Sequence, residues 1–122
     1  MKIRISLILI LIICTLAGCI FNNSENICIG IVDDLMSCWR QGYFRSAQRY
    51  LAIDSEDSLK PINKIISYRI LKTLPYDDHV NILVGVVHSG GAVGRYRARY
   101  GFVLKKIKGE WKVTSVRPKG AW

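Results

Sequence analysis

The first residue in this chain whose position suggests a specific chemical role is a cysteine that follows two small residues. Ala17-Gly18-Cys19 closes an apolar run, mostly Ile and Leu, that begins at Ile5 after Lys2 and Arg4. A cationic start, an apolar core and a small-residue cleavage site form a secretory signal. The run is about 13 residues long, short of the roughly 20 that a spanning helix needs. The sequence therefore predicts an exported protein that is cut near Cys19.

The four residues Leu16-Ala17-Gly18-Cys19 resemble the lipobox of bacterial lipoproteins. In that family the chain is cut before the cysteine, and the thiol is diacylglycerylated. The resemblance implies that residues 1–18 are a signal peptide, that Cys19 is the lipidation site, and that the lipid holds the protein in the cell envelope. Ile20 resembles the non-acidic signal for outer-membrane delivery in enterobacteria, which favours the outer membrane, facing the periplasm, over the inner one. A retained anchor and an ordinary signal peptide cut near Gly18 are the alternatives.

Two further cysteines, Cys28 and Cys38, remain after cleavage. If both lie on one helix, their Cα atoms are about 15 Å apart along its axis. A disulfide tolerates no more than roughly 7 Å. The pair could form only if the helix began after Cys28, so we expect two free, largely buried thiols.

The usual catalytic and metal-binding residues are sparse. His79 and His88 fall at the two ends of one predicted strand, roughly 30 Å apart and on opposite faces. They cannot share a metal, and each is expected to be a polar residue at a strand edge. Ser89 stands in no Gly-x-Ser-x-Gly elbow, and the glycine-rich residues 90–94 lead into a strand rather than into the helix that a phosphate loop requires. We expect no catalytic residue, no metal and no cofactor.

Positive charge is concentrated near the C-terminus. Without residues 1–18, 16 Lys and Arg stand against nine Asp and Glu, a net charge of about +7. Arg95, Arg97 and Arg99 follow one another at a spacing of two, which places them on one face of a strand, about 6.7 Å apart. Such a stripe suits a solvated outer face, or contact with anionic lipid or an acidic envelope partner. Nucleic acid is not expected, because an exported chain seldom meets it.

The helices that position these residues are predicted by apolar residues at steps of three and four. From residue 25 to 40 this pattern is typical of an amphipathic helix, which Gly42 ends. The expected inward residues are Ile27, Cys28, Ile31, Leu35, Cys38 and Trp39. A shorter second helix follows, with Phe44, Ala47, Tyr50 and Leu51 inward.

After Pro61 the period changes to two and predicts four strands joined by short loops. Two helices followed by such strands indicate an α+β domain, with the helices on one face of an antiparallel sheet. The expected inward residues are Ile66, Tyr68 and Ile70 in the first strand, Val80, Ile82, Val84 and Val86 in the second, Tyr96, Ala98, Tyr100, Phe102 and Leu104 in the third, and Trp111 and Val113 in the fourth.

Two stretches resemble small nuclear transport factor 2-like (cystatin-like) lipoproteins. Residues 39–47, WRQGYFRSA, resemble their helix–glycine–aromatic–helix opening. Residues 103–113, VLKKIKGEWKV, resemble their closing hairpin, in which a Lys-Gly turn precedes a Trp. The resemblance implies two or three N-terminal helices packed on a curved, cone-like sheet over residues 25–118, with residues 19–24 as a leash and 119–122 as a tail.

The expected function is that of a non-enzymatic binding or accessory module of the cell envelope. One alternative is a small pocket enzyme of the same fold, in which a tyrosine would work with Asp33 or Asp34. A carboxylate bonded to a tyrosine inside the cone would favour the enzyme, and an apolar interior the module. Another alternative is a subunit of an envelope or secretion complex, which predicts an exposed apolar patch or sheet edge. The sequence leaves the ligand and the oligomeric state open.

Overall fold

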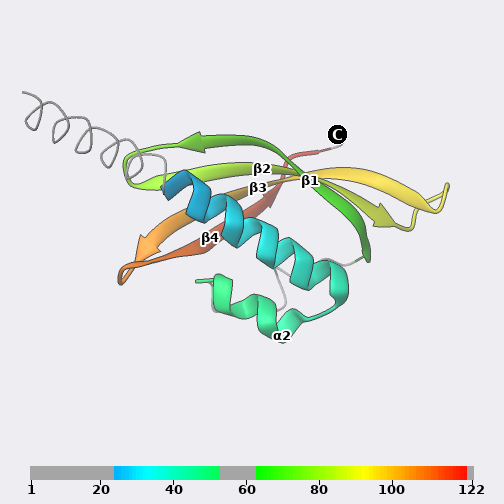
Figure 1. Cartoon of the computed structure of the whole chain (residues 1–122). Coiled ribbons are helices and arrows are strands. Elements are labelled where there is room, and N and C mark those ends of the chain that lie inside the picture. Colours follow the sequence, from blue (N-terminus) through cyan, green and yellow to red (C-terminus); the bar gives the residue numbers. More distant parts are fainter. Residues whose placement is uncertain (1–23, 53–62, 121–122) are drawn as a thin grey trace, which may run out of the picture.

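The computed structural model describes residues 24–52 and 63–120. The described part is an α+β domain, as the sequence predicts, with helices preceding a four-stranded antiparallel sheet (Figure 1). The strands pair in chain order, so β1 and β4 are the two edges of an open sheet. The elements are a long helix over residues 24–41, α2 (Phe44–Ala47), the 3-10 turn η1 (Gln48–Tyr50), β1 (Ile65–Pro75), β2 (His79–Ser89), β3 (Arg95–Ile107) and β4 (Glu110–Pro118).

Glycines end the elements where the sequence predicts turns. Gly42 follows the long helix with a φ of 82°, a conformation that favours glycine because it has no Cβ. Lys108 and Gly109 join β3 to β4 with φ values of 51° and 84°, as a two-residue hairpin of right-handed twist requires. The glycine-rich residues 90–94 connect β2 to β3 and precede no helix, so the predicted hairpin loop is confirmed.

The core lies between the helices and one face of the sheet, which we call the inner face. Trp39 from the long helix is 7% exposed, and its ring centroid is 6.2 Å from that of Phe102 on β3. The inward residues predicted for β2 are all buried, as are Phe102 and Leu104 of β3 and Val113 of β4. The buried apolar residues are Cys28, Val32, Leu35, Met36, Trp39, Ala47, Ile65, Val80, Ile82, Val84, Val86, Phe102, Leu104 and Val113.

The buried stripe of the long helix is rotated from the predicted one. Ile27, predicted inward, is 42% exposed, whereas Val32 and Met36 are buried. Isoleucines at neighbouring positions make this helix apolar around more than half of its circumference. Periodicity alone therefore cannot choose among several stripes, and packing on the sheet selects the one that contains Cys28 and Trp39.

Both remaining cysteines lie on the long helix and are free, as predicted. Cys28 is fully buried, and this burial raises the pKa of its thiol to about 11. Cys38 is half-buried. The two thiols therefore differ in access to solvent although they share one helix.

We expect a maleimide at pH 8 to label Cys38 of the native protein well before Cys28. Only the thiolate reacts, and the raised pKa leaves Cys28 about 100-fold less thiolate than an ordinary thiol. Peptide mass spectrometry over a time course measures both rates, and labelling in denaturant, where the two should react alike, is the control. Equal rates in the native protein would contradict the packing of this helix face.

Three β-bulges interrupt the period of two in the edge strands. In β1 the register shifts between Ile65 and Ser67, so that Ile65 is buried and Ile66 is 39% exposed. The prediction that Ile66 points inward is therefore wrong. Tyr68 and Ile70 do pack against the core. A bulge adds one residue to a strand, which moves every later side chain to the other face.

The second and third bulges redirect charged residues. In β1 the register shifts again between Ile70 and Lys72, so Lys72 pairs with Leu83 on the face away from the helices. In β4 the shift opposite Val103 leaves Thr114 unpaired, so that Arg117 pairs with Gly101 on that same face. The hydroxyl of Thr114 donates a 3.1 Å hydrogen bond to the Val103 carbonyl oxygen at the bulge.

Candidate functional site

One face of the sheet lies opposite the helices, and we call it the outer face (Figure 1). It carries a cluster of arginines and lysines. Arg95, Arg97 and Arg99 all lie on it, since they pair with Ser89, Val87 and Gly85 of β2. Arginines and lysines from the edge strands join them. We call this set the basic face: Arg69 and Lys72 on β1, Arg95, Arg97, Arg99 and Lys105 on β3, and Arg117 on β4.

The three arginines of the predicted stripe differ in their surroundings. Arg95 and Arg97 are exposed, whereas Arg99 is half-buried. The Nη2 of Arg99 donates to the Lys119 carbonyl oxygen at 3.1 Å, and its Nε is buried with no hydrogen-bond partner. The backbone of Arg99 also pairs with Lys119 and Gly120. Arg99 therefore holds the segment after β4 against the sheet.

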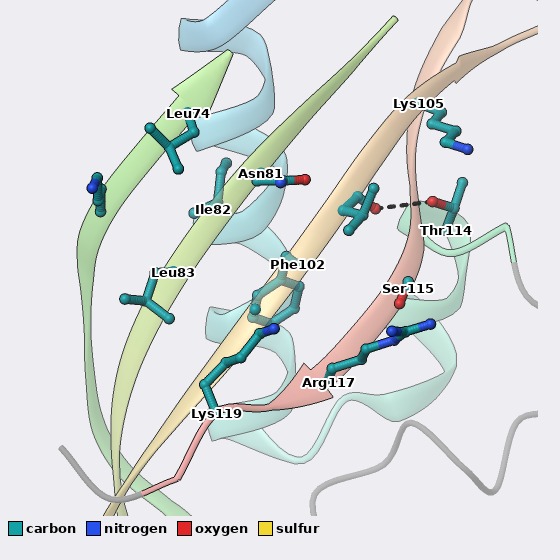
Figure 2. Close-up of a pocket in the computed structure, with 13 residues that line it drawn as sticks. Leu74, Asn81, Ile82, Leu83, Phe102, Lys105, Thr114, Ser115, Arg117 and Lys119 are labelled. Atoms are coloured by element: carbon teal, nitrogen blue, oxygen red, sulfur yellow. Dashed lines mark hydrogen bonds between the residues drawn. The ribbon is translucent and has the colours of Figure 1, made fainter. Parts of the chain in front are cut away.

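A pocket of about 670 Å³ lies on the basic face (Figure 2). One cross-strand row of its lining runs Lys72, Leu83, Gly101, Arg117, from one edge of the sheet to the other. The missing side chain of Gly101 leaves a hollow in this row, and the side chain of Lys119 crosses it. A Cβ at Gly101 would lie 2.9 Å from the Lys119 Cε.

The neighbouring row adds apolar and amide groups to the same pocket. It runs Leu74, Asn81, Val103, Ser115. Leu74 is 40% exposed. The Oδ1 of Asn81 is buried and has no hydrogen-bond partner. The pocket thus combines an apolar floor, one unsatisfied amide oxygen and a rim of cations.

Lys72, Arg117 and Lys119 are site residues that the sequence did not identify. A strict period of two would carry Lys72 inward after Tyr68 and Ile70, and Arg117 inward after Val113. Charged side chains are almost never fully buried without a partner. The period of two would bury Lys72 and Arg117, whereas their charge favours exposure. This conflict in the sequence could have indicated a bulge before each of the two residues.

The strands carry little negative charge, although Asp78, in the β1–β2 turn, lies near Lys105 of the basic face. The hydrogen bond to His79 and, less strongly, the charge of Lys105 lower the pKa of the Asp78 carboxyl. Glu110 is the one acidic residue in the four strands, and it lies at the hairpin between β3 and β4. Its Oε2 is 3.9 Å from the Nζ of Lys112, which also donates to the Arg49 carbonyl oxygen at 2.9 Å. Lys112 is therefore held at the edge of β4. No carboxylate lines the pocket in the part of the chain that the structure describes.

The two histidines lie on opposite faces of β2, as predicted, and neither faces the pocket. His79 contacts Asp78 and stacks on Tyr76 at the β1–β2 turn. His88 is 1% exposed, so its predicted place at a strand edge is wrong. Within residues 24–52 and 63–120 no group of His, Cys, Asp and Glu is placed to bind a metal ion.

The buried His88 is fully satisfied by hydrogen bonds. Its Nδ1 is 3.1 Å from the Asn63 carbonyl oxygen, and its Nε2 is 2.8 Å from the Tyr100 hydroxyl. A carbonyl oxygen only accepts, so Nδ1 carries a proton. Tyr96 stacks on the ring, with centroids 5.1 Å apart. These contacts hold Asn63 against the sheet and place a buried polar group on the inner face near the end of β2.

Of the tyrosine–carboxylate pairs considered for catalysis, the structure forms one. The Tyr68 hydroxyl donates to Asp33 Oδ1 at 2.7 Å. Burial, followed by the hydrogen bond to Asp33, raises the pKa of Tyr68 to about 12. Asp33 is exposed and lies outside the interior. The inner face is therefore not entirely apolar, and the carboxylate that bonds Tyr68 is not buried. A carboxylate–tyrosine pair inside the cone was expected for an enzyme and an apolar interior for a binding module, and the structure matches neither.

Comparison with known families finds no family to which the chain matches, and comparison with curated proteins finds no significant match. The expected lipidation site Cys19 lies outside the described residues. Among those residues no helix is long and apolar enough to cross a membrane.

Proposed function

We propose that this chain is a lipoprotein of the bacterial cell envelope, anchored through Cys19, whose domain is a non-enzymatic module that binds anionic lipid headgroups. The anchor is supported by the lipobox resemblance of Leu16-Ala17-Gly18-Cys19. Ile20 supports the outer membrane, facing the periplasm. The domain is of the nuclear transport factor 2-like, cystatin-like type, which the order of helices and strands supports.

The observation that carries the binding function is the separation of the two sheet faces. The inner face is covered by apolar helix residues, whereas the outer face carries arginine and lysine on β1, β3 and β4. A face built only for solubility needs charges of either sign. This one is nearly free of carboxylates, and a polybasic surface gains about 1 kcal/mol per basic residue near an anionic membrane.

The position of the helix start favours a membrane over an acidic protein as the partner. Thr73 of β1 donates a hydrogen bond to Glu25, near the start of the long helix. Ser24 follows Cys19 by five residues, which reach at most about 18 Å. Lys72 adjoins Thr73, so a lipid on Cys19 holds this end of the basic face near the headgroups. Arg95 lies six residues along β3 from Gly101, the β3 residue in the row of Lys72, and is therefore about 20 Å from this end.

Replacing Arg69, Arg95 and Arg97 with Gln should weaken vesicle binding roughly 100-fold at low salt, since each charge contributes about 1 kcal/mol. Arg99 stays because it holds the segment after β4. The measurement is co-sedimentation of the mature, unlipidated chain (Cys19→Ser) with phosphatidylglycerol vesicles. Binding of the parent should fall steeply as salt rises, because screening acts over about 8 Å at physiological ionic strength.

The matched control removes the same charge elsewhere. Arg40, Arg45 and Arg49 are exposed and lie in the long helix, α2 and η1, on the opposite side of the sheet from the basic face. Their replacement by Gln should leave vesicle binding within about twofold of the parent, because they are distant from the basic face. If both triple variants lost vesicle binding equally, net charge alone would explain the binding, and the proposed role of the basic face would be wrong.

The alternative, a small pocket enzyme, is favoured by one observation only, the hydrogen bond between Tyr68 and Asp33. A phenol with a pKa of about 12 stays protonated at neutral pH and serves as a donor. Asp33 and Tyr68 do not line the pocket on the basic face. The pair is better explained as a clamp between the long helix and β1.

A further inference from the structure

We infer that the pocket on the basic face binds one anionic amphiphile, a lipid whose phosphate head is held by the rim cations while its first apolar carbons cover the floor. This inference deepens the proposed function and rests on it. General attraction to a membrane needs only surface charge. A pocket that combines charge with an apolar floor selects a particular kind of molecule.

Cations reach the pocket from separate parts of the fold. Lys72 comes from β1, Lys105 from β3, Arg117 from β4 and Lys119 from the segment after β4. Lys72 and Arg117 lie on this face because each edge strand has a bulge before its cation. The strand register then places both residues in one cross-strand row. Arg99 fixes the backbone at Lys119. Lysine and arginine together around one hollow suit a phosphate group.

The floor favours an amphiphile over a free anion. Leu83 and Val103 are only half-buried, and Leu74 is 40% exposed, although all three line the pocket. An inorganic phosphate would leave these apolar surfaces in water. An alkyl chain would remove them from water, at about 25 cal/mol for each Å² covered.

Two further features fit a lipid. The hollow at Gly101 is crossed by the Lys119 side chain, whose stem is apolar and whose end is charged (Figure 2). Asn81 Oδ1 is buried without a partner and suits a hydroxyl donor such as a glycerol group. A second copy of this chain is disfavoured as the occupant, because two such faces would bring like charges together.

The test uses the full-length lipidated protein in dodecyl maltoside micelles. Dodecyl phosphate is the probe, inorganic phosphate is the free anion, and the host detergent itself is a matched uncharged amphiphile. Methyl NMR signals of Leu83 and Val103 report on the floor. We expect saturable shifts at one dodecyl phosphate per chain, and no such shifts with inorganic phosphate at the same concentration.

Two variants localise the effect. Gly101→Val fills the hollow without changing charge and should weaken binding about tenfold, since overfilled sites tolerate added methyl groups poorly. Ser67→Val adds the same side chain on the outer face outside the pocket lining and should bind like the parent. Lys72→Gln with Arg117→Gln alters exposed residues only and should weaken binding about 30-fold.

The outcomes separate this inference from the proposed function. Equal shifts with inorganic phosphate, or unchanged binding in both pocket variants, would overturn the amphiphile pocket while leaving the vesicle result standing. A dimer that forms through this face, seen by native mass spectrometry, would also overturn it. Loss of probe binding in the pocket variants, with probe binding kept when Arg69, Arg95 and Arg97 are replaced by Gln, would support it.

Discussion

Trp39→Ala is expected to lower the melting temperature of the domain by more than about 10 °C. Trp39 joins the long helix to Phe102 in the middle of the sheet, and it is 7% exposed. Removing a buried tryptophan side chain costs about 3–5 kcal/mol, a large part of the 5–15 kcal/mol that usually holds a domain together. Thermal unfolding followed by circular dichroism measures the loss.

Two controls set the scale for this result. Tyr43, beside the helix end, is 60% exposed, so Tyr43→Ala should change the free energy of unfolding by less than about 0.5 kcal/mol. Trp111 on β4 is half-buried against the core, so Trp111→Ala should fall between the two. If the Trp39→Ala and Tyr43→Ala proteins had the same melting temperature, the packing of the long helix on the sheet would be refuted.

Cys19→Ala should abolish lipidation altogether. Without the thiol no lipid can be attached, and cleavage before residue 19 should fail, so the precursor should keep residues 1–18. The variant should therefore differ from the wild-type protein in mass both by the missing lipid and by the retained residues 1–18. Intact-mass spectrometry of membrane and soluble fractions measures both the lipid and the cleavage.

The control for this experiment is Cys38→Ala, which removes a half-buried thiol of the same chain. It should leave lipidation and cleavage unchanged. A wild-type mature protein with an unmodified Cys19 would disprove the lipoprotein assignment, whatever the behaviour of the variant. The basic face would then have to be explained without an anchor.

Most of the fold could be predicted because its signals are local. The alternation from Arg95 to Lys105 sets which side of β3 is buried, and the Lys108-Gly109 turn forces the hairpin that follows. Gly42 ends the long helix where the sequence predicts. The buried stripe of that helix was misjudged, because Ile27 and its neighbours offer several apolar faces and only contact with the sheet selects one.

The candidate site could be predicted only in part. Arg95, Arg97 and Arg99 share a face because their strand has an unbroken period of two. The pocket depends instead on Lys72 and Arg117, which an unbroken period would place on the inner face. No local pattern marks an inserted residue, and the pairing of the strands alone shows it.

By itself the sequence determined the order of helices and strands, the antiparallel hairpins and the arginine stripe, since each depends on neighbouring residues along the chain. Only the tertiary structure decided which side of the long helix is buried, that His88 lies in the core, and that Lys72, Gly101 and Arg117 form one row. The physical reason is that register is a property of two strands together. One extra residue in an edge strand turns all the side chains beyond it to the opposite face, and here those side chains carry the charges of the proposed lipid pocket.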